Sequence, residues 1–368
     1  MNKKYENTIL VGMSGGVDSS VSAAILLEKE YNVIGVTIKP FDLSDLYVNP
    51  DKNYTCIKKT NIEDAKKVCR KLGIEHYVVD FSNIFKDKVA KDFINEYMSG
   101  RTPNPCVICN PIIKWGELLK TADELNAKFI ATGHYANINY DSSSKRYILL
   151  KGFDKSKDQS YFLWRLNQNQ LSRTIFPLGQ ITKEETRKLA SKFNLEVYNK
   201  PDSQEVCFIP DDDYRSFLEN VAYTTDSNNE GKFILNNKII GKHKGFQNYT
   251  IGQRKGLGVT YKEPLYVKSI NPETNTIELS INEDLYSSGL YANNVNFIKY
   301  NVLLDSKEFV VKIRYKDKGT KAFCSVENND KLKIIFFEKA RAITPGQSVV
   351  MYDNDEVVGG GIIESSFD

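Results

Sequence analysis

A strand, a glycine loop and a helix follow one another near the start of the chain and restrict the fold more than any other stretch. Residues 8–13 are apolar and predict a buried strand, and residues 21–27 (VSAAILL) predict a helix. The glycine loop between them, residues 14–20, reads SGGVDSS. Where a strand turns directly into a helix, the first N–H groups of the helix are unpaired and the positive end of its dipole lies behind them. The two glycines let an anion approach this backbone, so the loop predicts a phosphate site.

The glycine loop is not a Walker A loop, because that motif carries a Lys that reaches the terminal phosphates and this loop has none. Its spacing, S-G-G-x-D-S, resembles the PP-loop of ATP pyrophosphatases, which split ATP between the α and β phosphates. The hydroxyls of Ser14, Ser19 and Ser20 add donors, and Asp18 is a candidate ligand for Mg²⁺. The alternative is a Gly/Ser turn without a ligand, and the flanking strand and helix argue against it.

Strands and helices alternate over the first 211 residues. Further strands are predicted over 31–38, 76–81 and 129–132, with helices over 62–72, 84–98 and 112–125. Asn61 is expected to cap the helix over 62–72, and Thr182 with Glu185 predicts a capping box that begins a helix over 183–193. This alternation predicts an α/β fold, a doubly wound parallel sheet with helices on both faces. Ligands bind at the carboxyl ends of such strands, where we expect the glycine loop, Ile38, the cysteine loop 101–110 and Gly133-His134 to lie.

The rest of the chain is rich in short strands and polar turns, which predict a small β domain followed by a β-barrel. One predicted hairpin pairs residues 233–235 with 238–240 across the turn Asn236-Asn237. We therefore expect an α/β ATP-binding domain over residues 1–211, a small β-rich domain over 212–285 and a barrel over 286–368. The loop 253–258 (QRKGLG) carries two cations and is either an RNA contact or a solvated turn.

Composition limits the classes of function. The chain has 50 basic and 47 acidic residues, so any contact with RNA must come from a local basic face. No apolar run is long enough for a membrane span and no signal peptide precedes the first strand, so a cytoplasmic protein without membrane contact is expected. Six cysteines without a signal peptide do not indicate a disulfide framework. Cys69 and Cys324 fall among apolar residues and are predicted to lie in the core.

Seven segments together resemble the bacterial tRNA-specific 2-thiouridylase (MnmA) family, within the PP-loop ATP pyrophosphatases, and they occur in the family order over essentially the whole chain. They are GMSGGVDSS (12–20), RTPNPCVICN (101–110), ATGHYA (131–136), KDQSYFL (157–163), PDSQEVCFI (201–209), YTIGQRKGLG (249–258) and TPGQSVV (344–350). One such segment alone is a weak signal, whereas seven in order are highly specific.

The resemblance implies a sulfurtransferase, a tRNA-uridine 2-sulfurtransferase, with a catalytic domain over residues 1–211 and a tRNA-binding domain over 212–285. Such enzymes use ATP to adenylate the C2 oxygen of the wobble uridine and then replace that oxygen with sulfur from an enzyme persulfide, releasing AMP and pyrophosphate. The implied partners are tRNAs with Lys-, Glu- and Gln-type anticodons and a sulfur-carrier protein or cysteine desulfurase relay. A stacked base cannot present its C2 atom to a thiol, so the target base has to leave the stack.

The resemblance also implies site residues. Cys207 would carry the persulfide and Cys109 would be its partner, both partly exposed in electropositive surroundings that favour the thiolate. The residues expected at the nucleotide are Gly12, Met13, Ser14, Gly15, Gly16, Val17, Asp18, Ser19, Ile38 and Gly133. Those expected near the flipped base are Asn104, Pro105 and Cys106. Those expected to contact tRNA are His134, Lys157, Asp158, Gln159, Arg314, Tyr315 and Gln347.

One residue departs from the family pattern, because many members have Asp where this chain has Cys106. Cys106 either fills the Asp position passively, or is a spare thiol, or joins Cys109 and Cys207 in holding a [4Fe-4S] cluster with one open iron. The persulfide route is favoured over the cluster. Two other functions stay open on the residues alone: a PP-loop ligase acting on a small molecule, and a non-catalytic RNA-binding protein.

Overall fold

The computed structural model of the chain describes residues 6–39, 41, 46, 60–200, 206–209, 213–221, 230–327 and 331–368. These residues group into two compact units. The first consists of residues 1–89, 106–213 and 355–357, and the second of residues 90–105, 214–354 and 358–368. Cys56 and residues 201–205 of the PDSQEVCFI segment lie outside the described residues.

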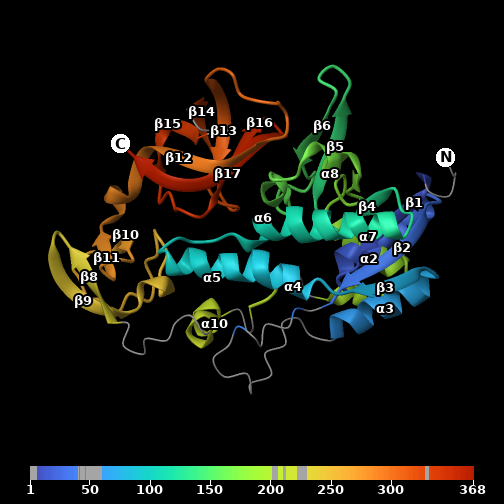
Figure 1. Ribbon diagram of the computed structural model, residues 1–368, viewed down its shortest axis with the longest axis horizontal. Coiled ribbons are helices and arrows are strands. Elements are labelled where there is room, and N and C mark those ends of the chain that lie inside the picture. Colours follow the sequence, from blue (N-terminus) through green and yellow to red (C-terminus); the bar gives the residue numbers. More distant parts are fainter. Residues whose placement is uncertain are drawn as a thin grey trace. The chain divides into compact units, whose positions relative to one another are not determined.

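The first unit contains a five-stranded parallel sheet in the order β3-β2-β1-β4-β7 (Figure 1). Its strands are β1 (Thr8–Gly12), β2 (Asn32–Ile38), β3 (Glu75–Val79), β4 (Phe129–Ala131) and β7 (Thr174–Ile175). The chain adds β2 and β3 on one side of β1 and β4 on the other, so the order reverses at β1. Ligand sites of open α/β sheets lie at such a reversal, which is where the glycine loop begins. The predicted doubly wound sheet is confirmed.

Helices cover both faces of this sheet. Buried side chains of α2 (Val17–Glu28), α3 (Thr60–Leu72) and α9 (Lys183–Lys192) share one core with Ile9 and Val11 of β1. Leu10 points to the opposite face and is also fully buried, and α7 (Leu118–Glu124) packs against β1 and β4. Cys69 lies in the α3 core, as predicted.

The segment with Cys106 and Cys109 is helical, so its prediction as a loop is wrong. Helix α6 (Pro105–Cys109) runs into a π-helix, η3 (Asn110–Glu117), which continues as α7. Proline has no N–H to lose at the first helical position, so Pro105 begins a helix here. The helix predicted over residues 112–125 therefore starts at Pro105, and Cys106 and Cys109 are three residues apart on it.

The first unit also contains several shorter elements. They are α4 (Ser82–Phe85), the π-helix η2 (Lys86–Ala90), the hairpin β5 (Ala136–Asp141) and β6 (Arg146–Lys151), η4 (Ser160–Leu163), α8 (Gln168–Ser172) and η5 (Glu196–Asn199). Leu150 of β6 pairs with Glu356. None of the helices among the described residues is long and apolar enough to span a membrane.

The second unit contains a four-stranded sheet and a closed barrel (Figure 1). The sheet has the order β10-β11-β8-β9, from β8 (Glu230–Leu235), β9 (Lys238–Lys244), β10 (Tyr266–Asn271) and β11 (Thr276–Ser280). The predicted hairpin turn at Asn236-Asn237 is confirmed, with φ of 49° and 63°. These positive angles suit Asn in a two-residue turn.

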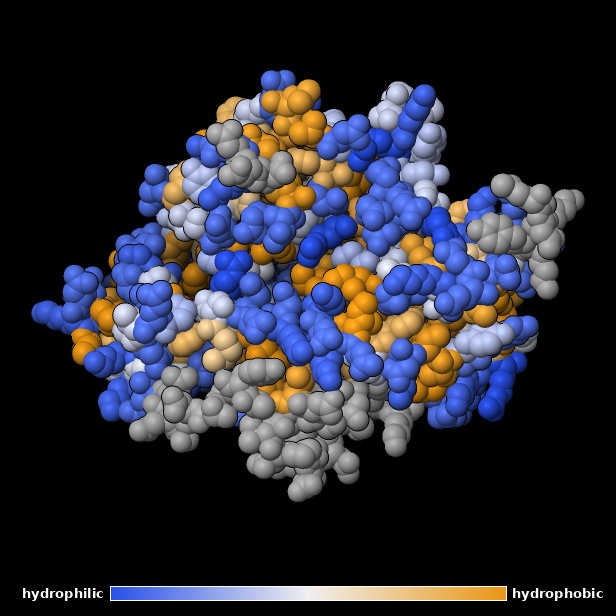
Figure 2. All heavy atoms as spheres, in the orientation of Figure 1, coloured by the Kyte–Doolittle hydropathy of each residue, from blue (hydrophilic) through white to orange (hydrophobic). Residues whose placement is uncertain are grey.

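Six strands form the barrel, which closes because β12 pairs with both β15 and β17. They are β12 (Tyr286–Phe297), β13 (Lys307–Lys312), β14 (Thr320–Glu327), β15 (Lys331–Arg341), β16 (Ser348–Asp353) and β17 (Glu356–Phe367). The predicted β domain and barrel are confirmed, and Cys324 lies in the barrel core. Helices α5 (Lys91–Met98) and α10 (Tyr214–Asn220), with η7 (Phe246–Asn248) and η8 (Asn282–Leu285), complete the unit. Figure 2 shows polar and apolar residues interspersed on the face that it draws.

Candidate active site

The glycine loop leaves the start of α2 open to an anion. Gly16 is the N-cap of α2 and provides no side-chain hydrogen bond to the first turn. The Ser19 hydroxyl instead accepts from the Ser14 N–H at 3.2 Å, and the Ser20 hydroxyl donates to the Gly16 carbonyl at 2.8 Å. The first N–H groups of α2 therefore keep their capacity to bind phosphate oxygens.

Two glycines allow close backbone packing around this loop. Gly15 has φ +70°, and a Cβ there would lie 2.3 Å from the carbonyl oxygen of Asn61. Gly133 follows β4, and a Cβ there would lie 2.9 Å from backbone and side-chain atoms of Asp18. Ile38 is half-buried at the end of β2. The carboxyl ends of β1 and β4 thus meet beside the loop, as the sheet predicted.

A lysine from a distant helix pairs with the loop. Lys183 Nζ donates to both carboxylate oxygens of Asp18, at 2.7 and 2.8 Å. The Tyr135 hydroxyl also donates to Asp18, at 3.0 Å. Lys183 is only 9% exposed. Asp18 was predicted as a candidate Mg²⁺ ligand, but in this structure its carboxylate is occupied by an ammonium group.

A second lysine holds the loop backbone. Lys200 Nζ donates to the Gly15 carbonyl at 2.9 Å and to Asn61 Oδ1 and Asp64 Oδ2, both at 2.8 Å. Asn61 lies inside α3, which begins at Thr60, so its prediction as the residue that caps this helix is wrong. Because Lys200 bridges α3 and the loop, it fixes the conformation that Gly15 permits.

Three thiols of the first unit influence one another. Cys106 and Cys207 are exposed and Cys109 is partly exposed, and none of them forms a disulfide. Desolvation raises the pKa of Cys109 to about 12, with smaller contributions from Cys207 and Cys106. Desolvation, followed by Cys106, likewise raises the pKa of Cys207 to about 11. The partial exposure was predicted, but the expectation of a favoured thiolate is wrong for this structure.

The pKa values of these thiols are raised because many protein atoms surround each one, although the residues are exposed or partly exposed. Lys114, on the π-helix η3, is the cation that lowers the pKa of all three thiols, and its contribution is smaller than that of desolvation. Cys207 is anchored by its neighbour Phe208, which is buried and packs edge-on against Phe85 with ring centroids 5.2 Å apart. The thiols are therefore held near one another but in their neutral form.

His134 lies among aromatic rings after β4. Its Nδ1 is 2.8 Å from the Thr132 hydroxyl, and its ring lies 5.4 Å from Trp115 and 6.2 Å from Phe176. Desolvation, with a smaller contribution from Lys114, holds the pKa of His134 well below its usual value. The imidazole is therefore neutral at physiological pH and can stack or hydrogen-bond but not form an ion pair.

Two residues of the KDQ segment (Lys157-Asp158-Gln159) form hydrogen bonds within the protein. Asp158 is buried and accepts from the N–H groups of Gly152 and Ser160 at 3.0 and 3.1 Å. Gln159 Oε1 accepts from the N–H of Tyr135 at 3.0 Å, next to His134. Lys157 is half-buried. Their predicted contact with tRNA stays a prediction. Asp158 here orders the backbone of Gly152 and Ser160, and Gln159 orders Tyr135, the residue that follows His134.

In the second unit, two of the matched motifs bind each other. Gln347 Nε2 donates to the carbonyls of Thr102 and Pro103 at 3.0 and 3.1 Å, and the Thr102 N–H donates to the Pro345 carbonyl at 2.9 Å. The segment that leads into Asn104 and Pro105 is thus attached to the barrel. Arg314 and Tyr315 lie in the turn between β13 and β14, where Arg314 is exposed.

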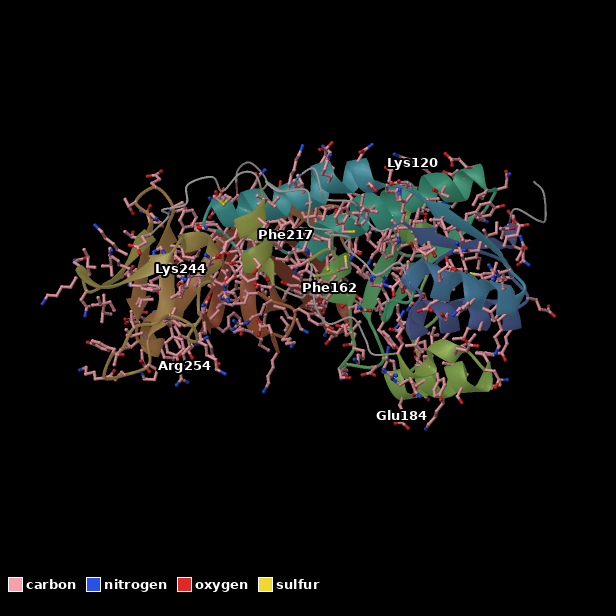
Figure 3. The ribbon with its side chains drawn as sticks, turned by 90° about the horizontal axis from the view of Figure 1, so that it is seen from below. Lys120, Phe162, Glu184, Phe217, Lys244 and Arg254 are labelled. Carbon is pink, nitrogen blue, oxygen red and sulfur yellow. The ribbon has the colours of Figure 1, made fainter. Side chains whose placement is uncertain are left out.

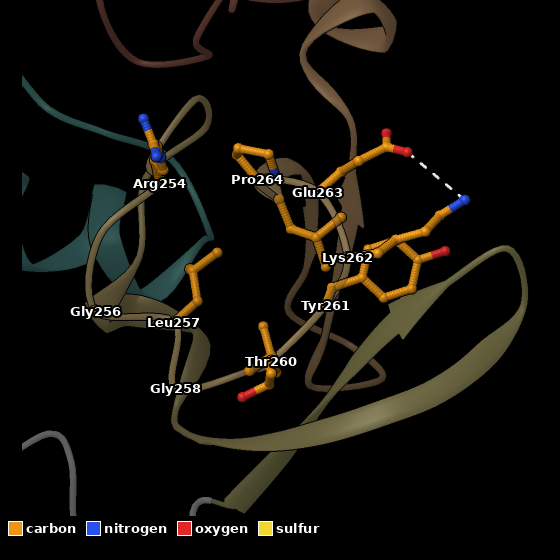
Figure 4. A pocket seen from close by; sticks show the side chains of 11 residues that line it. Arg254, Gly256, Leu257, Gly258, Thr260, Tyr261, Lys262, Glu263 and Pro264 are labelled. Atoms are coloured by element: carbon orange, nitrogen blue, oxygen red, sulfur yellow. Dashed lines mark ion pairs between the residues drawn. The ribbon is translucent and has the colours of Figure 1, made fainter.

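The QRKGLG loop lines an open pocket of about 520 Å³ in the second unit (Figure 4). Arg254 lies at one side of this pocket, and Lys262 pairs with Glu263 at 3.6 Å. Figure 3 shows Arg254 and Lys244 from another direction. The two hypotheses for this loop, RNA contact or solvated turn, both stay open.

No set of metal ligands is found in the part of the chain that the structure describes. Within it, no three or more His, Cys, Asp or Glu side chains are arranged to hold a metal ion. Cys106, Cys109 and Cys207 all belong to that part. The iron–sulfur hypothesis therefore gains no support from these residues.

Sequence reasoning missed Lys183, Lys200 and Lys114, because their partners are far away in the chain or depend on helix geometry. One signal was present for Lys183. It is the first residue of α9, whose predicted capping box of Thr182 and Glu185 is confirmed. A cation in the first turn of a helix is unfavourable next to the helix dipole, so a Lys at this position indicates an anionic partner outside the helix.

The comparisons with known proteins cover nearly the whole chain. Family models match residues 7–211 (tRNA methyl transferase HUP domain), 216–280 (tRNA methyl transferase PRC-barrel domain) and 287–363 (Aminomethyltransferase beta-barrel domain). A solved 4-thiouridine synthetase–RNA complex with bound ATP is similar at 19% identity and a TM-score of 0.34, over 58% of this chain and 50% of that chain. A likeness at this level supports no further conclusion.

Curated relatives are much closer. The chain is 50% identical to tRNA-specific 2-thiouridylase MnmA 1 of Caldanaerobacter subterraneus subsp. tengcongensis, over 98% of this chain and 99% of the relative. It is 46% identical to tRNA-specific 2-thiouridylase MnmA of Clostridioides difficile, over 100% of this chain and 99% of the relative. Identity at this level over the full length is enough to assign the family: the chain belongs to the tRNA-specific 2-thiouridylases.

Proposed function

We propose that the protein is a tRNA 2-thiouridylase, a sulfurtransferase that uses ATP to replace the C2 oxygen of the wobble uridine with sulfur. The observation that carries this proposal is the near-full-length identity to proteins named for that activity. The uncapped start of α2 and the three interacting thiols belong to one unit and suit the two halves of the reaction. Neither a small-molecule ligase nor a non-catalytic RNA-binding protein is favoured.

The first half of the reaction is adenylation. The C2 oxygen of the uridine attacks the α phosphorus of ATP, an O–P bond forms, and pyrophosphate leaves. The N–H groups at the start of α2 are suited to bind the phosphates, and Gly15, held by Lys200, keeps the loop open for them. The residues proposed to bind the nucleotide are those that the resemblance implied, from Gly12 to Ser19 together with Ile38 and Gly133.

The second half is sulfur transfer. The terminal sulfur of a persulfide on Cys207 attacks C2, and AMP leaves with the oxygen. The Cys109 thiolate then attacks the Cys207 sulfur and breaks its bond to the transferred sulfur, which stays on the base. The product is a Cys109–Cys207 disulfide, which an external thiol must reduce before the next cycle.

Cys109 needs activation for this step, and Cys207 needs it for the earlier loading of its persulfide, because burial raises the pKa of both thiols. Binding of tRNA or of the sulfur donor must therefore deprotonate them or change their surroundings. Asn104, Pro105 and Cys106 are proposed to lie near the flipped base. His134, Lys157, Asp158, Gln159, Arg314, Tyr315 and Gln347 are proposed to contact or order tRNA.

Several finer points belong to this proposal. We propose domain boundaries at residues 211 and 285. The proposed partners are tRNAs with Lys-, Glu- and Gln-type anticodons and a sulfur-carrier or desulfurase relay. Modification of tRNA would take place in the cytoplasm. Mg²⁺ would accompany ATP, but Asp18 is paired with Lys183 and does not fit as its ligand here. No step is assigned to a metal ion.

The test is thiolation in a purified system. The protein, ATP, a tRNA transcript with a wobble uridine, a cysteine desulfurase with cysteine as the persulfide donor, and a thiol reductant are incubated, and the nucleosides are analysed by mass spectrometry. The expected result is 2-thiouridine at the wobble position and pyrophosphate release that requires tRNA. Pyrophosphate release that is independent of tRNA, without gain of sulfur by the RNA, would contradict the proposal.

A further inference from the structure

The glycine loop contains no cationic side chain to neutralise the phosphates of ATP. The triphosphate of ATP carries several negative charges, whereas the start of a helix supplies only about half a positive charge. Walker A loops add a Lys that reaches the terminal phosphates, and this loop has none. A cationic side chain from elsewhere in the first unit would, in addition to Mg²⁺, supply the charge that this loop lacks.

Lys183 is placed to supply that cation. Its Nζ lies 2.7 Å from Asp18 Oδ1 and 2.8 Å from Oδ2, and Asp18 belongs to the first turn of α2. The ammonium group is thus within a few ångströms of the N–H groups that would bind phosphate. The Lys183 side chain is buried, and its Nζ lies 5.9 Å from the centre of the Tyr135 ring. These surroundings limit the directions that the side chain can take.

The structure around Lys183 holds it in this position. It is the first residue of α9, its N–H donates to Asp154 Oδ2 at 3.0 Å, and α9 packs against α2. The next residue, Glu184, points outward from α9 (Figure 3) and pairs with Lys188 in solvent. A lysine at the first helical position opposes the helix dipole, so its stability depends on the partner across the interface.

Lys200 shows the contrast. Its ammonium group donates to three oxygens, of Gly15, Asn61 and Asp64, and so fixes the backbone of the loop. Lys183 instead pairs with a side chain of the loop itself, the carboxylate of Asp18, which can hold a cation in place beside a bound anion. The two lysines therefore have different functions.

We propose that Lys183 binds the β and γ phosphates of ATP and that Asp18 is its positioning residue. In this arrangement Lys183 acts as the lysine that the loop lacks, supplied by a helix more than a hundred residues further along the chain. It neutralises charge on the pyrophosphate that leaves during adenylation. This inference rests on the proposed function only for the identity of the reaction, because binding of the nucleotide can be measured without tRNA or sulfur.

The experiment compares nucleotides that differ only in their phosphates. Dissociation constants for AMP, ADP and ATP are measured on the full chain, for the wild type and for Lys183→Met, Lys183→Arg and Lys188→Met. Lys183→Met is expected to weaken ATP at least about tenfold and AMP less than about twofold, because a charged hydrogen bond to the terminal phosphates is lost. Lys183→Arg should recover part of the ATP affinity, and Lys188→Met should match the wild type.

An equal loss of affinity for all three nucleotides, or no loss for ATP, would overturn the inference.

A second experiment uses Asp18→Asn to test the role of Asp18. If Asp18 acts by positioning Lys183, its effect on ATP affinity should largely disappear in the Lys183→Met background, whereas additive effects would contradict that role. Circular dichroism verifies that each variant is folded. A wild type that binds ATP but does not thiolate tRNA would reject the proposed function and leave this inference standing.

Discussion

The glycine loop and the three thiols of the first unit differ in how ready they are for chemistry. The loop is already formed: Gly15 has its positive φ, Lys200 binds its backbone and the first N–H groups of α2 lack a side-chain cap. The thiols are near one another but have a raised pKa, to about 12 for Cys109 and about 11 for Cys207. One site is preorganised and the other is inactive until its surroundings change.

This difference has a chemical reason. A phosphate loop gains from rigidity, because fixed N–H dipoles do not need to reorient when the anion binds. A thiolate reacts readily with oxidants and electrophiles, so a thiol that stays neutral at rest is protected from such side reactions. We therefore expect changes at the loop to alter nucleotide affinity and changes at the thiols to alter rates and their pH dependence.

The largest expected effect is the loss of either catalytic thiol. Cys207→Ser and Cys109→Ser should each reduce thiolation by about a thousandfold or more, because the hydroxyl neither carries a transferable sulfur nor forms the disulfide. Release of pyrophosphate in the presence of tRNA should persist. Thiolation and pyrophosphate assays with a cysteine desulfurase and cysteine as the persulfide donor measure both, and full thiolation by Cys109→Ser would contradict its assignment.

Cys106→Ser is the matched control for these variants. The persulfide route predicts a small effect, since Cys106 only adds to the raised pKa of its neighbours. A loss as large as that of Cys207→Ser, together with iron in anaerobically purified protein, would instead favour the cluster. A colourless, iron-free protein that thiolates tRNA would exclude it.

The next effect concerns the loop. Gly15→Ala should weaken ATP binding about a hundredfold, because the new Cβ would lie 2.3 Å from the Asn61 carbonyl at a φ of +70°. Gly73→Ala is the control: its φ is +68°, but no atom lies within 4 Å of the new Cβ. It should cost about 1 kcal/mol of stability and leave ATP affinity unchanged. Equilibrium ATP binding and thermal melting separate the two outcomes.

The sequence was sufficient to predict features that depend on local rules. The loop between strand and helix, the parallel sheet, the capping box of α9 and the Asn236-Asn237 hairpin all follow from short segments. The helix at Cys106 and Cys109 was missed because two prolines suggested a loop, although Pro105 starts the helix. The pairing of Lys183 with Asp18 and the raised thiol pKa values were missed because they depend on atoms brought together by the tertiary fold.

A smaller effect is expected from the cation beside the thiols. Below its pKa, a thiol gains about tenfold in thiolate per pH unit, so alkylation of Cys207 should accelerate about tenfold from pH 7 to 8 and again to pH 9. Lys114 lowers the pKa of Cys207, so Lys114→Met should raise that pKa further and slow alkylation by about threefold at each pH.

Lys120→Met is the control, because Lys120 is exposed on α7 (Figure 3) and pairs with Glu117. Its alkylation rates should equal those of the wild type. Peptide mass spectrometry after timed iodoacetamide treatment gives the rates. A rate that is already maximal at pH 7 would mean a thiolate at rest, and the contrast between the loop and the thiols would fail.

The smallest effect tests whether the segment leading to Asn104 and Pro105 is preorganised like the loop. Gln347 donates two hydrogen bonds to the carbonyls of Thr102 and Pro103. Gln347→Ala should raise the KM for tRNA about threefold with kcat nearly unchanged, since only part of the roughly 1 kcal/mol that each such hydrogen bond contributes has to be regained when tRNA orders the segment. In the free protein, amide hydrogen exchange over residues 100–104 should accelerate, while exchange in the β8–β9 hairpin stays the same. If tRNA binding weakens without any change in exchange, Gln347 acts by touching RNA directly, and the segment then resembles the thiols in taking its active form only when the substrate arrives.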